Sequence, residues 1–188
     1  MKNTILERYP QMPDGCYVID INAGCISDLY NDFDRIAPYV RKELDQDLVD
    51  YITDSARDLG KVEYLIRFRL QEQASEDLQA RIIKSINSYF LYLRSIELSE
   101  LGRMMKTSLG FLLIGIFILF LSVWVNGSIT DDSSVIQKVF AEGLTVAAWV
   151  AMWESLATFL FNWTPISRKV RLYKRIASTP VQFARSGH

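Results

Sequence analysis

One carboxylate in this sequence lies where ordinary solvation is not available to it. Glu154 is part of AAWVAMWESLATFLF (147–161), inside a run of apolar residues long enough to cross a bilayer. A carboxyl group at that depth has to be neutralised, hydrogen-bonded or hydrated through a pore. Ser155, next to it, and Thr158, one helical turn further on, are the nearest hydroxyl groups in the segment. We therefore expect Glu154, Ser155 and Thr158 to form a polar site within the membrane.

Two kinds of chemistry fit such a site. Copies of Glu154 from several subunits would line a pathway for cations or protons, as rings of acidic side chains do in cation-selective pores. Alternatively, the protonated carboxyl would be a structural clamp that donates a hydrogen bond across a helix interface. Ser108 and Ser122, on the preceding apolar segment, are candidate neutral partners for that bond. The sequence leaves both interpretations open.

Other reactive residues are sparse. Cys16 and Cys25 match no recognised metal or redox spacing, and His188 is the only histidine. The sequence contains no glycine-rich phosphate loop, no HExxH and no GxSxG motif. We therefore expect no catalytic residues, no metal site, no cofactor and no enzymatic activity.

Two apolar segments have the length of membrane spans. The first covers 107–126 and contains TSLGFLLIGIFILFLSVWV without a charge, and the second covers 139–163. They are joined by an outer loop at 127–138. Three acidic residues lie in or near this loop and could form an outer vestibule, or belong to an ordinary solvated turn: Asp131, Asp132 and Glu142.

Small and hydroxylated residues form a stripe on each predicted span. Since lipid provides no hydrophobic drive between helices, such stripes are typical of helix contacts. On the second span the predicted stripe lies on the same face of the helix as Glu154, because residues three and four apart share a helical face. The residues expected to pack are Ser108, Gly115 and Ser122 on the first span, and Gly143, Ala147 and Ala151 on the second.

Charge is distributed unevenly, although the net charge of the 188-residue chain is only −1. Arg103 and Lys106 precede the first span and a basic cluster follows the second, whereas the connecting loop has only Lys138. By the positive-inside rule both termini are predicted to be cytoplasmic, in a bacterial-type inner membrane. The tail at 164–188 should bind anionic lipid headgroups through Arg168, Lys169, Arg171, Lys174 and Arg175. An alternative is that the tail docks on an acidic stripe formed by Asp47, Asp50, Asp54 and Asp58, which would otherwise be solvated.

The segment 1–75 is predicted to be a small cytoplasmic α/β domain. Alternating apolar residues predict strands at 16–21 and 62–70, and helical spacing after the N-cap candidate Asp45 predicts a helix at 46–59. Because an isolated pair of strands is marginal in water, we expect a third strand within 1–15 or 25–40, or completion of the core by neighbouring subunits.

A long amphipathic helix is predicted at 76–106 and should run directly into the first span. Its apolar seam has the spacing of a coiled coil and would promote self-association. Alternatively, the seam packs on the small sheet of its own chain. The seam residues are Ile82, Ile86, Tyr89, Leu93 and Ile96.

The outline of a soluble N-terminal domain, a long helix, a short outer loop and acids around a second span resembles that of calcium uniporter pore subunits. That family's motif places an Asp and a Glu around a Trp-led sequence ending in Pro. The stretch VFAEGLTVAAWVAMWESL lacks this motif. The resemblance is therefore one of architecture.

Together these patterns predict an α+β membrane protein with a helical hairpin behind a small α/β domain. The leading hypothesis for its function is a homo-oligomeric scaffold or partner-binding protein in the membrane. The alternative is an oligomeric cation or proton channel with Glu154 in its pathway. Expected partners are anionic lipids, further copies of the chain and a cytoplasmic protein, but not nucleic acid.

Overall fold

The computed structural model describes residues 5–31, 38–39, 42–71, 74–128 and 135–185. The chain divides into two compact units. The first, the α/β unit, combines Met1–Ser95 with Lys169–His188, and the second, the helical unit, comprises Ile96–Arg168. The predicted mixture of helices and strands is therefore present, as a small strand-containing region and long helices.

The first elements of the α/β unit follow the local sequence signals. Strand β1 spans Tyr17–Ala23 and is followed by a short 3₁₀ helix, η1 (Ile26–Leu29). Helix α2 spans Gln46–Leu59, and the Asp45 side chain accepts hydrogen bonds from the backbone N–H groups of Asp47 and Leu48 at its start. Gly60 ends the helix with a φ of 64°, which favours glycine. The predicted helix at 46–59 is confirmed.

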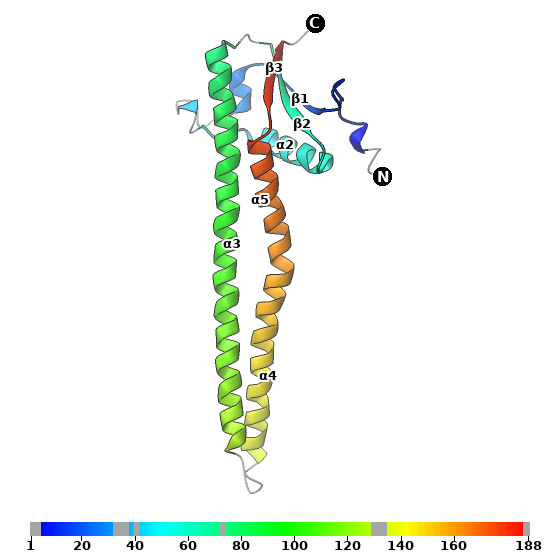
Figure 1. Ribbon diagram of the computed structural model, residues 1–188. Helices are drawn as coiled ribbons and strands as arrows, with labels where there is room; N and C mark the ends of the chain where they lie inside the picture. The colour runs from blue at the N-terminus through cyan, green and yellow to red at the C-terminus, as the bar shows by residue number, and fades with distance from the viewer. Residues whose placement is uncertain (1–4, 32–37, 40–41, 72–73, 129–134, 186–188) are drawn as a thin grey trace. The chain divides into compact units, whose positions relative to one another are not determined.

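The sheet has three parallel strands in the order β1-β2-β3 (Figure 1). Strand β2 (Tyr64–Leu70) is central, with Ile19 beside Ile66 on one edge and Val181 beside Ile66 on the other. The third strand, β3 (Val181–Arg185), comes from the end of the chain. The expectation of a third strand within 1–15 or 25–40 is wrong for the described residues, because the chain's own C-terminal segment completes the sheet.

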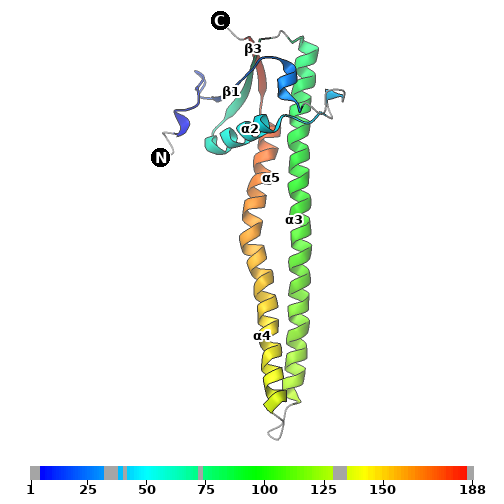
Figure 2. The same cartoon turned by 180° about the vertical axis from the view of Figure 1, so that it is seen from behind.

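One face of the sheet carries the core of this unit, and α2 runs across one end of the strands in both views (Figures 1 and 2). Ile19, Ile66 and Phe68 are fully buried there, together with Ile52 and Leu59 of α2. Ile82, Ile86 and Phe90 of α3 and Ile176 of α5 join the same cluster. The beginning of the predicted seam thus packs on the chain's own domain, whereas Ile96 is 45% exposed.

The opposite face of the sheet is polar at its centre. Arg67 on β2 donates two hydrogen bonds to the Asp20 carboxylate on β1, from Nε to Oδ1 at 2.6 Å and from Nη2 to Oδ2 at 2.8 Å. Arg69 donates a third at 3.3 Å. The Arg67 guanidinium holds the pKa of Asp20 below its usual value, against the opposing effect of partial burial.

The helical unit contains parts of two long helical segments. Helix α3 is continuous over Glu76–Gly127, as predicted for a helix that runs into the first apolar segment. Helix α4 (Val135–Ala157) passes through a π-helical turn, η4 (Thr158–Asn162), into α5 (Trp163–Ala177). The second segment therefore stays helical well beyond residue 163, and the residues expected to form a basic tail are divided between α5 and β3.

Two helices of the described chain are long and apolar enough to cross a membrane. Only 17% and 11% of the residues in their most apolar windows are buried. The core helix of a soluble protein is mostly buried, so these windows are unlike core helices. This low burial supports a membrane location.

Candidate functional site

The two apolar helices pack against each other through small residues. Figures 1 and 2 both show α3 and α4 side by side and antiparallel. The first helix contributes the stripe that was predicted for it, since Ser108, Gly115 and Ser122 are all buried. The second contributes Ala141, Ala148 and Ser155, again at intervals of seven. Such spacing keeps one face of each helix at a close contact.

Hydrogen bonds connect the two helices at both ends of this contact. The Ser155 hydroxyl donates to the backbone carbonyl of Ser108 at 2.7 Å. Ser122 and Thr145 share a hydrogen bond between their hydroxyl groups at 2.6 Å. Ser122 and Ser155 thus make their hydrogen bonds within one chain, whereas the buried Ser108 hydroxyl has no hydrogen-bond partner among the described residues.

Gly115 marks a close approach between the helices. A Cβ atom at this position would lie 2.8 Å from Met152 Cγ, 3.1 Å from Met152 N and 3.3 Å from the Ala148 carbonyl oxygen. In contrast, a Cβ atom at Gly110 would meet nothing within 4 Å. Gly115 is therefore a packing residue, while Gly110 is not.

Glu154 does not face this contact. Its side chain is exposed, and none of the described residues gives it a hydrogen bond or an ion pair. Gly143 and Ala147 are exposed as well, and Ala151 and Thr158 are half-buried. The expected packing face of the second span is thus displaced by about one residue, or 100° of helix rotation, because the contact uses Ala141, Ala148 and Ser155. Glu154 and its small neighbours form a second, outward face.

The contacts between the helices also define how far along the helix pair Glu154 lies. Ser155 meets Ser108 and Thr145 meets Ser122, so residue 154 lies level with about residues 109–113 of α3. The charge-free stretch of the first span begins at residue 107. Glu154 thus lies about one turn inside the apolar region of the pair, deeper than Arg103 and Lys106 of α3.

The expected outer acids are only partly described. Glu142 is exposed on the first turns of α4. Asp131 and Asp132 lie outside the described residues, so the structure gives no account of a vestibule.

The basic residues after the second span divide into two groups. Arg168, Lys169, Arg171 and Lys174 are exposed on α5. Arg175 is half-buried, and its guanidinium donates to the backbone carbonyl oxygen of Val62 and lies 4.6 Å from the centre of the Tyr64 ring. Arg175 therefore contacts the α/β unit itself.

The aspartates of the acidic stripe predicted on α2 have hydrogen-bond and ion-pair partners outside the basic tail. Asp50 accepts a hydrogen bond from Gln46, and Asp54 pairs with Arg57 at 2.6 Å. Tyr9 donates to the Asp58 carboxylate at 3.1 Å. The partners of these three aspartates all belong to the N-terminal part of the chain.

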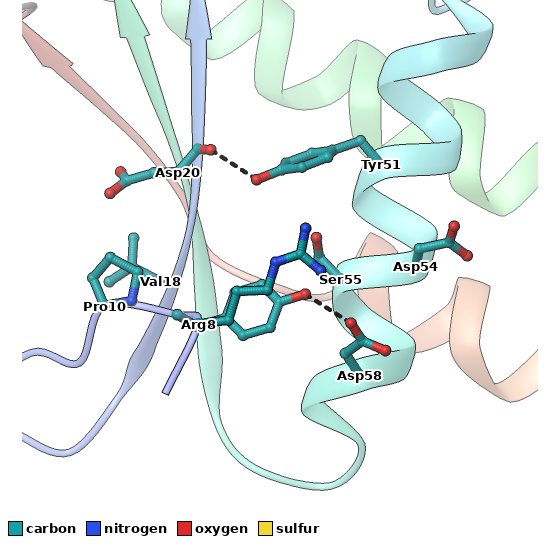
Figure 3. A pocket seen from close by; sticks show the side chains of 9 residues that line it. Arg8, Pro10, Val18, Asp20, Tyr51, Asp54, Ser55 and Asp58 are labelled. Carbon is teal, nitrogen blue, oxygen red and sulfur yellow. Dashed lines mark hydrogen bonds between the residues drawn. The ribbon is translucent and has the colours of Figure 1, made fainter. Parts of the chain in front are cut away.

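A pocket of about 320 Å³ lies between α2, the edge strand β1 and the N-terminal segment (Figure 3). Figure 3 shows Tyr51 pointing to the strand, where its hydroxyl donates to the Asp20 carbonyl oxygen at 3.3 Å. Tyr9 and Asp58 also line the pocket and are hydrogen-bonded to each other, and burial raises the pKa of Tyr9. The lining carboxylates already have partners within the chain, and the pocket was not predicted from the sequence because its walls come from three separate segments.

The cysteines do not form a redox or metal centre with each other. Both are free thiols, and the Cys25 thiol donates to the Asp28 carboxylate at 2.9 Å. Within the described part of the chain, no group of three His, Cys, Asp or Glu residues is placed to hold a metal ion.

Comparisons with protein families, with curated proteins and with solved structures give no match.

Proposed function

We propose that this chain is a homo-oligomeric two-pass membrane protein, in which α3 and α4 cross the bilayer and the α/β unit is a cytoplasmic module that binds a partner protein. Its copies meet through the outward face of α4, which we define as Gly143, Ala147, Ala151 and Glu154. One observation carries this proposal: Glu154 lies on a face that the contact within the chain leaves uncovered.

The outward face of α4 would place an acidic side chain against lipid in a single copy. An acidic side chain facing lipid costs roughly 2.5–3.5 kcal/mol on insertion scales. A second copy removes that cost, because rotational symmetry places the same residue of each copy at the same depth. Gly143 and Ala147 let two such helices approach closely. The Glu154 side chains of two copies can then face each other away from lipid.

Orientation follows from topology and charge together. Strand β3 pairs with β2, so the chain enters and leaves the helical pair from one α/β unit. This connectivity supports a hairpin with both ends on the same side of a membrane. Arg103, Lys106 and the basic residues of α5 favour the cytoplasmic side by the positive-inside rule.

The test is the mass of the protein particle in a mild detergent and in lipid nanodiscs. The wild type should be oligomeric, and Ala147→Leu should dissociate it because the larger side chain separates the outward faces. Val146→Leu is the matched control, since it changes an exposed residue about 100° away around α4. Glu154→Gln retains hydrogen bonding and should remain oligomeric. A wild-type monomer in nanodiscs would contradict the proposal.

A second function is favoured by the same uncovered acid. If copies of Glu154 surround an axis, they form a ring that attracts cations or protons. Liposomes containing the wild type should then leak cations or protons, while Glu154→Gln should lower the flux at least tenfold. Glu142→Gln is the control for a general change in charge. Tight wild-type liposomes would exclude conduction and leave the scaffold role.

A further inference from the structure

We propose that α5 is an anionic-lipid anchor, in which Arg168, Arg171 and Lys174 bind phospholipid headgroups at the cytoplasmic surface. This inference rests on the proposed membrane crossing, and adds a lipid class and three specific residues to it. It begins from the exposure of these side chains on a helix that continues from the second apolar segment.

The two sides of α5 have opposite roles. Leu172, Tyr173 and Ile176 pack on the core of the α/β unit, and the Tyr173 ring lies 6.1 Å from that of Phe90. At 100° per residue, Arg171 and Lys174 project from the side opposite Ile176. This face is therefore presented outward by the same packing that fixes the helix.

The direction of the side chains favours the membrane. In an α-helix every Cα–Cβ bond tilts toward the N-terminus, and the N-terminus of α5 is Trp163, at the end of the apolar segment. A tryptophan there is typical of the headgroup level. Long basic side chains on α5 consequently lean back toward the lipid surface.

The three residues lie at graded distances from that surface. At 1.5 Å per residue, Arg168 is about 7.5 Å along the helix from Trp163, Arg171 about 12 Å and Lys174 about 16.5 Å. The headgroup layer is about 5–7 Å thick, and an Arg side chain can extend several ångströms back into it. Lys174 is within about one Debye length of the layer. We expect the contribution to lipid binding to decrease in the order Arg168, Arg171, Lys174.

Charge selects the kind of lipid. None of the three residues is paired with an acidic side chain in the described part of the chain, and α5 contains no acidic residue. Arg175 has the same charge but is held by Val62 and Tyr64. Net positive charge next to a span attracts anionic headgroups and gives no such gain with zwitterionic ones.

The experiment measures binding of short-chain phosphatidylglycerol and phosphatidylcholine to the full-length protein in neutral detergent, by native mass spectrometry. The wild type should prefer phosphatidylglycerol, and this preference should fall as salt is raised. Arg168→Gln should lower the affinity for phosphatidylglycerol about fivefold, the contribution of one basic residue at an anionic surface. Arg171→Gln and Lys174→Gln should have successively smaller effects.

Two controls separate a lipid site from general charge and from misfolding. Arg81→Gln removes an exposed charge paired with Asp77 in the α/β unit and should leave the lipid preference unchanged. Arg175→Gln should lower the melting temperature, because it loses contacts within the unit, without changing the preference. Equal loss from Arg81→Gln and Arg168→Gln would overturn the inference.

Two further measurements distinguish a lipid headgroup from free phosphate, and the lipid anchor from the proposed membrane crossing. Inorganic phosphate at the same concentration should not displace phosphatidylglycerol, and displacement would indicate a simple phosphate site and overturn the inference. If the protein is extracted from membranes by alkaline carbonate, the proposed membrane crossing fails. If it resists extraction but shows no preference for phosphatidylglycerol, only the lipid anchor fails.

Discussion

The α/β unit and the helical unit bury opposite kinds of side chain. In the α/β unit the large residues Ile19, Phe68 and Phe90 are completely buried. In the helical unit Phe120 and Trp124 are each 72% exposed, while the buried positions are small or hydroxylated: Ser108, Gly115, Ser122, Ala141, Ala148 and Ser155.

This difference in burial supports a lipid surrounding for the helical unit and an aqueous one for the α/β unit. In water, burial of large apolar side chains is the dominant favourable contribution to folding. In lipid that drive is missing between helices, and close packing and hydrogen bonds hold them together instead. A single chain therefore follows two packing rules, and substitutions of one type should have different effects in the two units.

The largest expected contrast is between two phenylalanines. Phe68→Ala should lower the free energy of unfolding of the α/β unit by about 3–5 kcal/mol, because it leaves a cavity in a closed core. Phe120→Ala should have almost no effect in nanodiscs, since acyl chains fill the vacated volume. Urea titrations of the full-length protein in nanodiscs measure both. Equal losses would show that the helical unit has a water-type core.

The second-largest effect on stability should come from a charged contact in the α/β unit. Asp20→Asn removes the carboxylate that accepts three hydrogen bonds from Arg67 and Arg69, and should cost about 2 kcal/mol at neutral pH. Because the folded pKa of Asp20 is lowered, its contribution is present above pH about 4 and is lost as the pH falls through the folded value.

The pH dependence of unfolding tests whether the ionised Asp20 carboxylate makes this contribution to stability. The difference in stability between the wild type and Asp20→Asn should be constant between pH 5 and 7, and should shrink at lower pH. A difference that stays constant into the acid range would mean that packing, and not ionisation, makes the contribution.

The smallest effect should come from a single methyl group in the helical unit. Gly115→Ala should weaken the helix contact by about 1 kcal/mol, because its Cβ atom would lie 2.8 Å from Met152 Cγ. Gly110→Ala is the control. In a variant with Ser122→Cys and Thr145→Cys, disulfide formation should be about fivefold less favourable with Gly115→Ala. An unchanged equilibrium would contradict the close packing.

Local signals predicted most of the early fold. The strands and α2 were found because alternation and helical spacing are visible over short windows, and because Asp45 and Gly60 mark the ends of α2. Strand β3 was missed because it is only five residues long and follows Pro180. Its place is determined by parallel pairing with β2, which no local window contains.

The sequence predicted that small and hydroxylated residues form the contact between the two apolar helices. It did not predict which face of the second helix makes that contact. The face of the first span was found from the sequence, since Ser108, Gly115 and Ser122 recur every seven residues. On the second span two faces are rich in small residues, and the one containing Glu154 was chosen. The sevenfold spacing of Ala141, Ala148 and Ser155 was the available signal for the other face.

Closure of the sheet by β3 also has a consequence for biosynthesis. The ribosome makes β2 first and then residues 71–180, so both apolar helices emerge while the edge of β2 that will pair with β3 is still open. The pairing of β2 with β3 can therefore form only after both apolar helices have been synthesised. A nascent chain stalled before Val181 should be more protease-sensitive in its N-terminal part than a chain that includes β3, because it lacks the pairing of β2 with β3.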